Sequence, residues 1–201
     1  MYKKWKAVLV VAVVSSAFLL SGCFFNIFQT AKTVGAGNVA LTIGSGLFDF
    51  QVDDDHNWSI TPQARISFGL SDKVDLGFQT GAMISLETGN PAWLGAIGDL
   101  KFSLLDDPDS FSLAFGFGGG SASELAGWGA FLEIFFDSNV KALPIFISYR
   151  PLFPFNAGTF TVWHHLAGGL RLKLSDAAVL LIEVDTFGRM ISFGLALEVT
   201  F

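Results

Sequence analysis

Apolar and polar residues alternate with a period of two over most of this sequence. The pattern is clearest from Trp58 to Leu70, and residues 74–87 and 191–201 repeat it. Successive side chains of a strand point to opposite faces of a sheet, so the pattern predicts strands with one apolar and one polar face. Ten strands are predicted, over residues 38–52, 58–70, 74–87, 92–105, 111–120, 127–136, 143–150, 161–174, 177–185 and 189–201.

The first predicted strand changes phase in its middle. Its apolar residues are odd-numbered up to Ile43, whereas Phe48 and Phe50 are even-numbered. A β-bulge at the glycines of residues 44–46 would account for the change.

The connections between the strands are of two kinds. Those after the even-numbered strands are short and acidic (70–73, 106–109, 137–139 and 175–177), whereas those after the odd-numbered strands vary in length. About 11 residues per strand, at about 3.3 Å each and tilted by about 40°, span roughly the thickness of a membrane. The fold class predicted is therefore all-β, an antiparallel up-and-down transmembrane barrel of about ten strands, with eight or twelve as alternatives.

The composition of the polar face favours apolar side chains on the outside of this barrel. That face holds many glycines, which a water-exposed face would not favour and which a narrow lumen accommodates. The alternative is a soluble barrel or sandwich with the apolar face inside. The glycines are Gly69, Gly77, Gly81, Gly95, Gly116, Gly118, Gly129, Gly169 and Gly194.

The polar face also carries charges of both signs. Because a lone buried charge is very costly, such groups are expected to pair across a lumen in a barrel about 20 Å wide. The lumen would then be closed, or open only to small solutes; the alternative is that individual charges lie in water at the rims. The predicted network comprises Arg65, Lys101, Arg150, Arg171, Lys173, Asp75, Asp99, Glu133, Glu183 and Glu198.

The first 22 residues have the features of an export signal. Three lysines precede an apolar run over residues 7–20, which is too short to span a membrane as a helix. The sequence Leu20-Ser21-Gly22-Cys23 resembles the lipobox of bacterial lipoproteins. This resemblance implies a signal peptide over residues 1–22 and a covalent lipid, palmitate included, on Cys23, with no other cofactor expected.

The lipobox resemblance also implies where the mature chain begins. Residues 23–37 would form a lipidated linker on the periplasmic side, followed by the barrel at 38–201. Phe24, rather than Asp, follows the cysteine, which implies export to the outer membrane. The apolar residues 24–28 are expected at the inner-leaflet interface.

The last strand resembles the β-signal of bacterial outer-membrane barrel proteins. The resemblance rests on Ser192, Gly194 and the terminal Phe201, whereas Leu197 and Val199 stand where aromatic residues are commoner. It implies that Gly194 and Phe201 are read by the barrel assembly machinery. The implied partners are that machinery, the lipoprotein-processing enzymes and outer-membrane lipids.

Four tryptophans open the even-numbered strands at the loop rim: Trp58, Trp93, Trp128 and Trp163. This placement is typical of an interfacial aromatic girdle. Trp93 and Trp163 have the parity of the polar face, so either bulges near Pro91 and Thr161 turn them outward or they fill the mouth of the lumen.

Composition excludes several other classes of protein. The net charge of −6 without a basic stripe argues against a nucleic-acid partner, and a single cysteine excludes a disulfide framework. Residues 53–56 (Asp-Asp-Asp-His) lack the glycine and distal glutamate of a calcium loop and are interpreted as a solvated hairpin tip, so no metal is expected.

The function predicted is that of a non-enzymatic outer-membrane barrel lipoprotein, either structural or a narrow passage for small solutes. One alternative is a conduit or binder for hydrophobic solutes that uses an apolar outer loop at residues 151–155. The other is a lipid-modifying enzyme, for which His164 and Ser59 are the residues to test. The sequence leaves the oligomeric state open.

Overall fold

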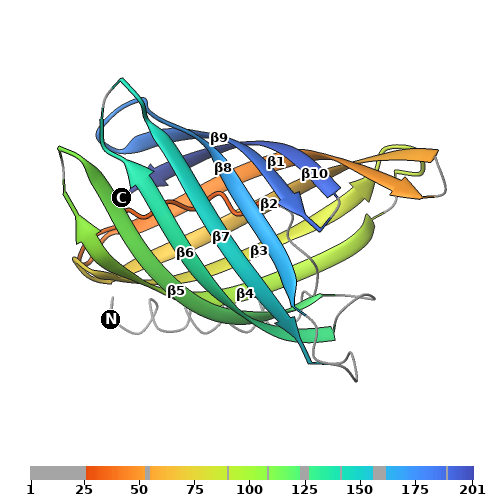
Figure 1. The fold of residues 1–201 in the computed structure, drawn as a ribbon, viewed down its shortest axis with the longest axis horizontal. Coiled ribbons are helices and arrows are strands. Elements are labelled where there is room, and N and C mark those ends of the chain that lie inside the picture. Colours follow the sequence, from red (N-terminus) through yellow and green to blue (C-terminus); the bar gives the residue numbers. More distant parts are fainter. Residues whose placement is uncertain are drawn as a thin grey trace, which may run out of the picture.

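The protein is a closed barrel of ten antiparallel strands (Figure 1). Each strand pairs with its neighbours in the sequence, and the first closes the barrel against the last. This confirms the predicted fold class. The computed structural model describes residues 26–52, 55–89, 91–107, 109–122, 127–140, 142–155, 162–188 and 190–201.

The strand bounds differ from those predicted by at most four residues at either end. Within the described residues, no helix is long and apolar enough to cross a membrane. The strands are β1 (Val39–Val52), β2 (Asp55–Ser71), β3 (Val74–Ser85), β4 (Pro91–Asp106), β5 (Phe111–Ala122), β6 (Gly127–Ser138), β7 (Ile145–Pro154), β8 (Trp163–Lys173), β9 (Ala178–Phe187) and β10 (Met190–Thr200).

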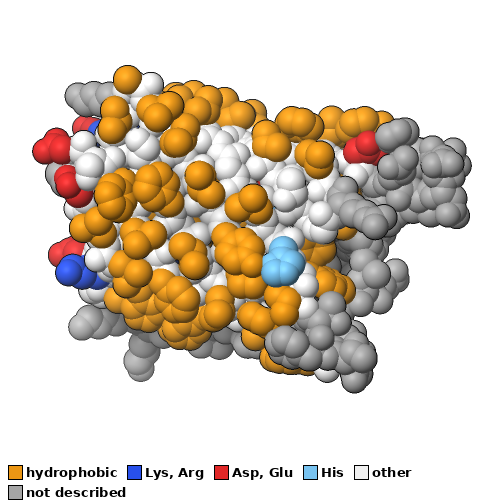
Figure 2. Space-filling view, viewed as in Figure 1, with side chains coloured by type: hydrophobic (Ala, Val, Ile, Leu, Met, Phe, Trp, Pro, Cys, Tyr) orange, Lys and Arg blue, Asp and Glu red, His pale blue; other side chains and the backbone are white. Residues whose placement is uncertain are grey.

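Most apolar side chains of the strands point outward and most polar ones inward, as β10 illustrates, although Phe135, Phe146 and Leu181 point inward and are buried. Phe193 and Leu195 are 60% and 54% exposed, whereas Ser192 and Ala196, which flank them, are buried. Hydrophobic side chains cover much of the outer surface in Figure 2, and charged side chains gather near its ends. The orientation predicted from the glycine-rich polar face is therefore confirmed.

The bulge predicted in the first strand is wrong. The pairing of β1 with both β2 and β10 runs without a register shift through residues 44–46. Phe48 consequently points inward and is fully buried, and Leu47 points outward. The glycine at position 46 serves a different purpose, because a Cβ there would lie 1.8 Å from Oδ1 of Asn26 inside the barrel.

Register shifts do occur elsewhere in the wall. They lie at Gly69/Ser71 in β2, at Met83/Ile84 in β3 and at Ser103/Leu105 in β4. The second lies opposite Pro91, where one of the two predicted bulges was placed.

Residues 151–154, predicted as an apolar outer loop, instead extend strand β7. Pro154 and Leu152 pair with Gly129 and Phe131 of β6, and Leu152 also pairs with Trp163 of β8. Of the predicted loop only Phe155 lies beyond the strand, and it is 71% exposed.

The residues before β1 lie inside the barrel. Asn26, Ile27 and Phe28 are buried in the lumen, so the expected position at a membrane interface is wrong for these three residues. We call residues 26–34 the plug. The plug runs from the middle of the lumen to the turn rim, where Gly35 and Gly37 adopt positive φ angles of 85° and 77° and reverse the chain into β1. Positive φ is strained for other residues, so glycine suits this reversal.

Candidate functional site

The lumen is the candidate site, and ion pairs line its wall between β2 and β7. Nη1 and Nη2 of Arg65 donate to the two carboxylate oxygens of Asp99 at 2.6 and 2.8 Å, and Nε donates to the Ser67 hydroxyl at 3.1 Å. Both charged side chains are almost completely buried. This bidentate geometry satisfies the guanidinium and the carboxylate together, which a buried pair requires.

A second wall pair joins β7 to β6. Nε of Arg150 donates to Oε1 of Glu133 at 2.7 Å, and both residues are buried. The guanidinium also lies over the ring of Phe131, 4.9 Å from its centroid, a cation–π arrangement.

The third wall pair also binds the plug. Nζ of Lys101 lies 3.2 Å from Oδ2 of Asp75 and donates to the carbonyl oxygens of Thr30 and Lys32 at 3.2 and 2.5 Å. Both carboxylate oxygens of Asp75 accept from the backbone N–H of Val34 at 3.1 Å. One buried pair of charges therefore holds the C-terminal half of the plug.

Glu183 of β9 binds the N-terminal end of the plug. Its two carboxylate oxygens accept hydrogen bonds from the backbone N–H groups of Ile27 and Phe28, each at 2.8 Å, and Oε1 also accepts from Nδ2 of Asn26 at 3.3 Å. No Lys, Arg or His among the described residues lies within ion-pair distance of Glu183. The plug backbone therefore supplies the hydrogen bonds that this buried carboxyl group needs.

The remaining plug contacts come from several other strands. Oδ1 of Asp137 accepts from the N–H of Ala31 at 2.9 Å, and the Ser148 hydroxyl donates to the carbonyl of Gln29 at 3.1 Å. Nε2 of Gln79 donates to the carbonyl of Asn26 at 3.2 Å, and Oδ1 of Asn26 accepts from the hydroxyl of Ser192 at 3.1 Å. The plug is thus bonded to strands around the whole circumference.

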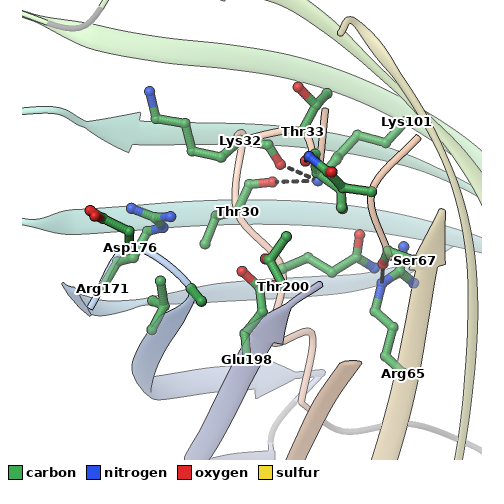
Figure 3. A pocket seen from close by; sticks show the side chains of 15 residues that line it. Thr30, Lys32, Thr33, Arg65, Ser67, Lys101, Arg171, Asp176, Glu198 and Thr200 are labelled. Atoms are coloured by element: carbon green, nitrogen blue, oxygen red, sulfur yellow. Dashed lines mark hydrogen bonds between the residues drawn. The ribbon is translucent and has the colours of Figure 1, made fainter. Parts of the chain in front are cut away.

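A cavity of about 310 Å³ lies beside the plug in the turn-side half of the lumen (Figure 3). It is lined by Arg171 and Glu198, two members of the predicted network that have no ion-pair partner among the described residues. Glu198 accepts from the Thr42 hydroxyl at 3.3 Å, and Nε of Arg171 is buried without a hydrogen-bond partner. These charges face the cavity instead of pairing across the lumen.

Lys173 lies at the turn rim in water. Its side chain is 63% exposed and pairs with Asp176 three residues later, at 2.7 Å. The hydrogen bond from Lys173 and its positive charge lower the pKa of Asp176. Lys173 therefore follows the alternative in which individual charges lie in water at the rim, and it is not part of a network inside the lumen.

The two adjacent histidines lie on opposite faces of the wall. His165 is buried inside, with Nε2 3.4 Å from Oδ2 of Asp185. His164 points outward, where its Nδ1 is hydrogen-bonded to the Tyr149 hydroxyl at 2.7 Å and the two rings stack. Ser59 points into the lumen and is buried, so the wall separates it from His164.

The structure describes the side chains of two of the four tryptophans predicted to form an aromatic girdle. Trp58 points outward and is 42% exposed, whereas Trp163 packs edge-on against Phe187, with 5.7 Å between ring centroids. The backbones of Trp93 and Trp128 lie in β4 and β6, but their side chains lie outside the described residues, as do Cys23 and the side chains of residues 53–56.

Of the two assembly-signal residues, Gly194 lies within β10 and Phe201 directly follows it. Gly194 faces the plug, and a Cβ there would lie 2.5 Å from Nδ2 of Asn26. Phe201 follows β10 at the turn rim, with its side chain 74% exposed and its N–H donating to the carbonyl of Val39 at 2.8 Å.

Sequence reasoning did not identify the plug residues or Asp137 as part of the site. Asn26, Gln29 and Thr30 precede the first alternating segment and carry no periodic signal. Asp137 was assigned to an acidic turn, but it closes β6 and points into the lumen. Within the described ranges, no group of three His, Cys, Asp or Glu side chains could hold a metal ion.

Comparison with known proteins gives similarity of structure only. No protein-family model and no curated protein matches the sequence. Among solved structures, the outer membrane protease OmpT from Escherichia coli is 8% identical with a TM-score of 0.45, over 82% of this chain and 96% of that one. The outer membrane protein OprG from Pseudomonas aeruginosa is 10% identical with a TM-score of 0.40, over 86% and 99%. The KdgM porin is 10% identical with a TM-score of 0.39, over 82% and 99%. The likeness that these three proteins share with this chain is that of the barrel fold.

Proposed function

We propose that this chain is a non-enzymatic barrel lipoprotein of the bacterial outer membrane. In this proposal its own N-terminal segment closes the lumen at rest, and small solutes pass only when that segment moves. The observation that carries the proposal is the occupied lumen: an apolar outer wall surrounds charged groups that are bonded to the plug.

The outer surface supports the membrane location. Large apolar side chains are exposed on strand after strand, including Ile43, Ile134 and Phe193 at 58%, 50% and 60%. A closed barrel leaves no strand edge unpaired, which is what hydrocarbon requires of a sheet. We expect the purified mature chain to need detergent, and a chain that stayed monomeric in water without it would contradict this location.

The plug supports a closed resting state. It is bonded to β3, β4, β6, β7, β9 and β10, so a solute crossing the lumen meets its backbone. The cavity described above lies only beside its turn-side half.

The separation of the candidate catalytic groups supports a non-enzymatic role. A nucleophile and its general base must lie within hydrogen-bonding reach of each other. Ser59 is inside the wall and His164 outside it, and the Nδ1 atom of His164 is engaged by Tyr149. Replacing either residue by alanine should leave membrane lipid profiles unchanged, and an altered profile would support the enzymatic alternative.

Single-channel recording in planar bilayers tests the closed state. Gly46→Ala/Gly194→Ala places two methyl groups 1.8 and 2.5 Å from atoms of the Asn26 side chain, and the second also 2.5 Å from the Phe28 ring, so both plug side chains must leave their present positions and we expect the plug to be displaced. Gly168→Ala is the matched control, because its Cβ would meet nothing nearer than 3.5 Å. We expect wild type and the control to be silent and the double variant to conduct.

The recordings separate the two roles combined in the proposal. A stable open level in wild type would contradict the closed resting state. If the double variant is silent although rapid hydrogen exchange shows that the Ile27 and Phe28 amides are no longer bonded, passage of solutes is excluded and only the structural role remains.

Lipidation is tested independently of conductance. Labelled palmitate should be incorporated into wild type and not into Cys23→Ser. Equal labelling of the two would refute the lipid on Cys23.

A further inference from the structure

The cavity beside the plug, which we call the turn-side cavity, has the size and the position of a binding site. Its volume of about 310 Å³ is near the lower end of the range found for small-molecule pockets. Asp176 and Ala177 of the β8–β9 turn line it and are exposed, so the cavity reaches the turn rim. A small molecule that enters there contacts the barrel and also the plug, which contributes Gln29, Thr30, Lys32, Thr33 and Val34 to the lining.

Most of the charged groups that line the turn-side cavity already have partners. Arg171 of β8 and Glu198 of β10 are the exceptions, since neither has an ion-pair partner in the described part of the chain. Figure 3 shows both side chains at the cavity. The unpaired charges of the cavity are therefore one of each sign. The paired groups are Arg65 with Asp99, Lys101 with Asp75, Lys32 with Asp106, and Asp176 with Lys173.

Arg171 and Glu198 are separated across the barrel wall. Strand β9 lies between their strands, and their charged groups are beyond ion-pair distance of each other. Neighbouring strands are about 4.8 Å apart, so the backbones of β8 and β10 are about 10 Å apart. Val179 of β9, which is buried and pairs with Glu198, lines the same cavity. A small molecule between the two charges would thus also meet an apolar side chain.

Other polar atoms of the cavity lining lack the hydrogen bonds that burial normally requires. Gln29 is 3% exposed, and neither Nε2 nor Oε1 of its amide has a partner among the residues that the structure describes. Nε of Arg171 is buried without a partner as well. Buried polar groups are nearly always hydrogen-bonded, so these exceptions point to a polar ligand at this place.

We propose that the turn-side cavity binds a small zwitterion with one carboxylate and one ammonium group, such as a free α-amino acid. Arg171 donates to the carboxylate, and Glu198 accepts from the ammonium group. The Gln29 amide offers the same ligand one further donor group and one acceptor. A simple anion would be repelled by Glu198 and a simple amine by Arg171. Binding here does not require solutes to pass through the barrel, so it goes beyond the proposed function.

Saturation-transfer NMR on the purified protein in detergent micelles tests this ligand class. The probes are L-alanine, propionate, which lacks the ammonium group, and ethylamine, which lacks the carboxylate. We expect saturable binding of L-alanine. Propionate and ethylamine should each bind about tenfold more weakly or worse, because each loses one charge-assisted contact. Absence of saturable L-alanine binding, or binding of either other probe as tight as that of L-alanine, would overturn the proposal.

Variants test whether the two unpaired charges form the site. Arg171→Gln and Glu198→Gln should each weaken L-alanine binding about tenfold or more. Lys73→Gln and Glu87→Gln are the matched controls, since they remove the same charges from exposed positions outside the cavity, and they should bind as wild type does. Gel mobility with and without boiling checks that each variant folds, and the three probes on wild type decide the question if one does not. Unchanged binding in folded Arg171→Gln or Glu198→Gln would overturn the proposal.

Discussion

Two regions of the lumen provide partners for buried acidic side chains in different ways. Between β2 and β7 the barrel wall supplies its own cations, as in the pairs of Arg65 with Asp99 and of Arg150 with Glu133. On β9, Glu183 accepts hydrogen bonds from backbone N–H groups of the plug. The wall pairs belong to the barrel alone, whereas the β9 carboxylate is satisfied only while the plug is in place.

The difference explains why the plug belongs to the fold. A buried carboxylate without a partner is costly, and Glu183 would become such a group if the plug left and water did not replace it. Asp75 and Lys101 form an intermediate case, since they pair with each other and also bind the plug. Loss of the plug is therefore expected to destabilise the barrel at Glu183 on β9, whereas the pairs of Arg65 with Asp99 and of Arg150 with Glu133 would persist without it.

The largest effect is expected from breaking a wall pair. Arg65→Ala leaves Asp99 buried without its cation, and we expect a loss of about 3–5 kcal/mol in the free energy of unfolding. Denaturant unfolding in detergent micelles, followed by tryptophan fluorescence, measures it. Arg65→Leu/Asp99→Leu should lose much less, and an equal loss in both would show that the charge pair is not the cause.

Breaking the β9 contact should act on the plug more than on the wall. Glu183→Ala leaves the N–H groups of Ile27 and Phe28 without an acceptor, a cost of about 1–3 kcal/mol. Hydrogen exchange should accelerate at these two amides while the amides of β2–β5 stay protected. Glu198→Ala, whose carboxylate binds Thr42 and not the plug, is the control. Uniform acceleration in all strands would contradict the distinction between the two regions.

A smaller effect is expected from a neutral contact between wall and plug. Ser148→Ala removes the hydroxyl that donates to the carbonyl of Gln29, and we expect a loss of about 0.5–1.5 kcal/mol in the same unfolding measurement. Ser45→Ala, at an exposed outward position on β1, should be neutral. A loss as large as that of Arg65→Ala would mean that charge is not what distinguishes the strongest contacts.

The smallest effect is expected at the turn rim. Lys173→Ala removes an exposed pair and should leave the unfolding midpoint unchanged at neutral pH. Because Lys173 lowers the pKa of Asp176, this variant should return that pKa toward its ordinary value. The pairing contributes only above the lowered pKa and is lost as the pH falls through it. Titration followed by NMR measures the shift, and an unchanged pKa would place the cause elsewhere.

The sequence predicted the wall well because alternation in a strand is a local property. The ten strands, their order and the inward charges followed from it, and so did the outward orientation of Leu195 and Phe193. The plug could not be predicted in this way, since residues 26–34 have no periodicity and take their conformation from partners as far as 157 residues away. The bulge predicted at residues 44–46 failed for the same reason: Phe48 points inward because the loop side of the lumen is apolar there.

The glycine reversal at residues 35–37 has a consequence for how the protein is assembled. It joins the plug directly to β1, and β1 meets β10 at the seam between the two ends of the chain. That seam has the greatest loop to close, so its formation is entropically the most demanding step. Because only the short reversal separates the plug from β1, closing this seam brings together three parts of the chain at once: the plug, the first strand and the last strand.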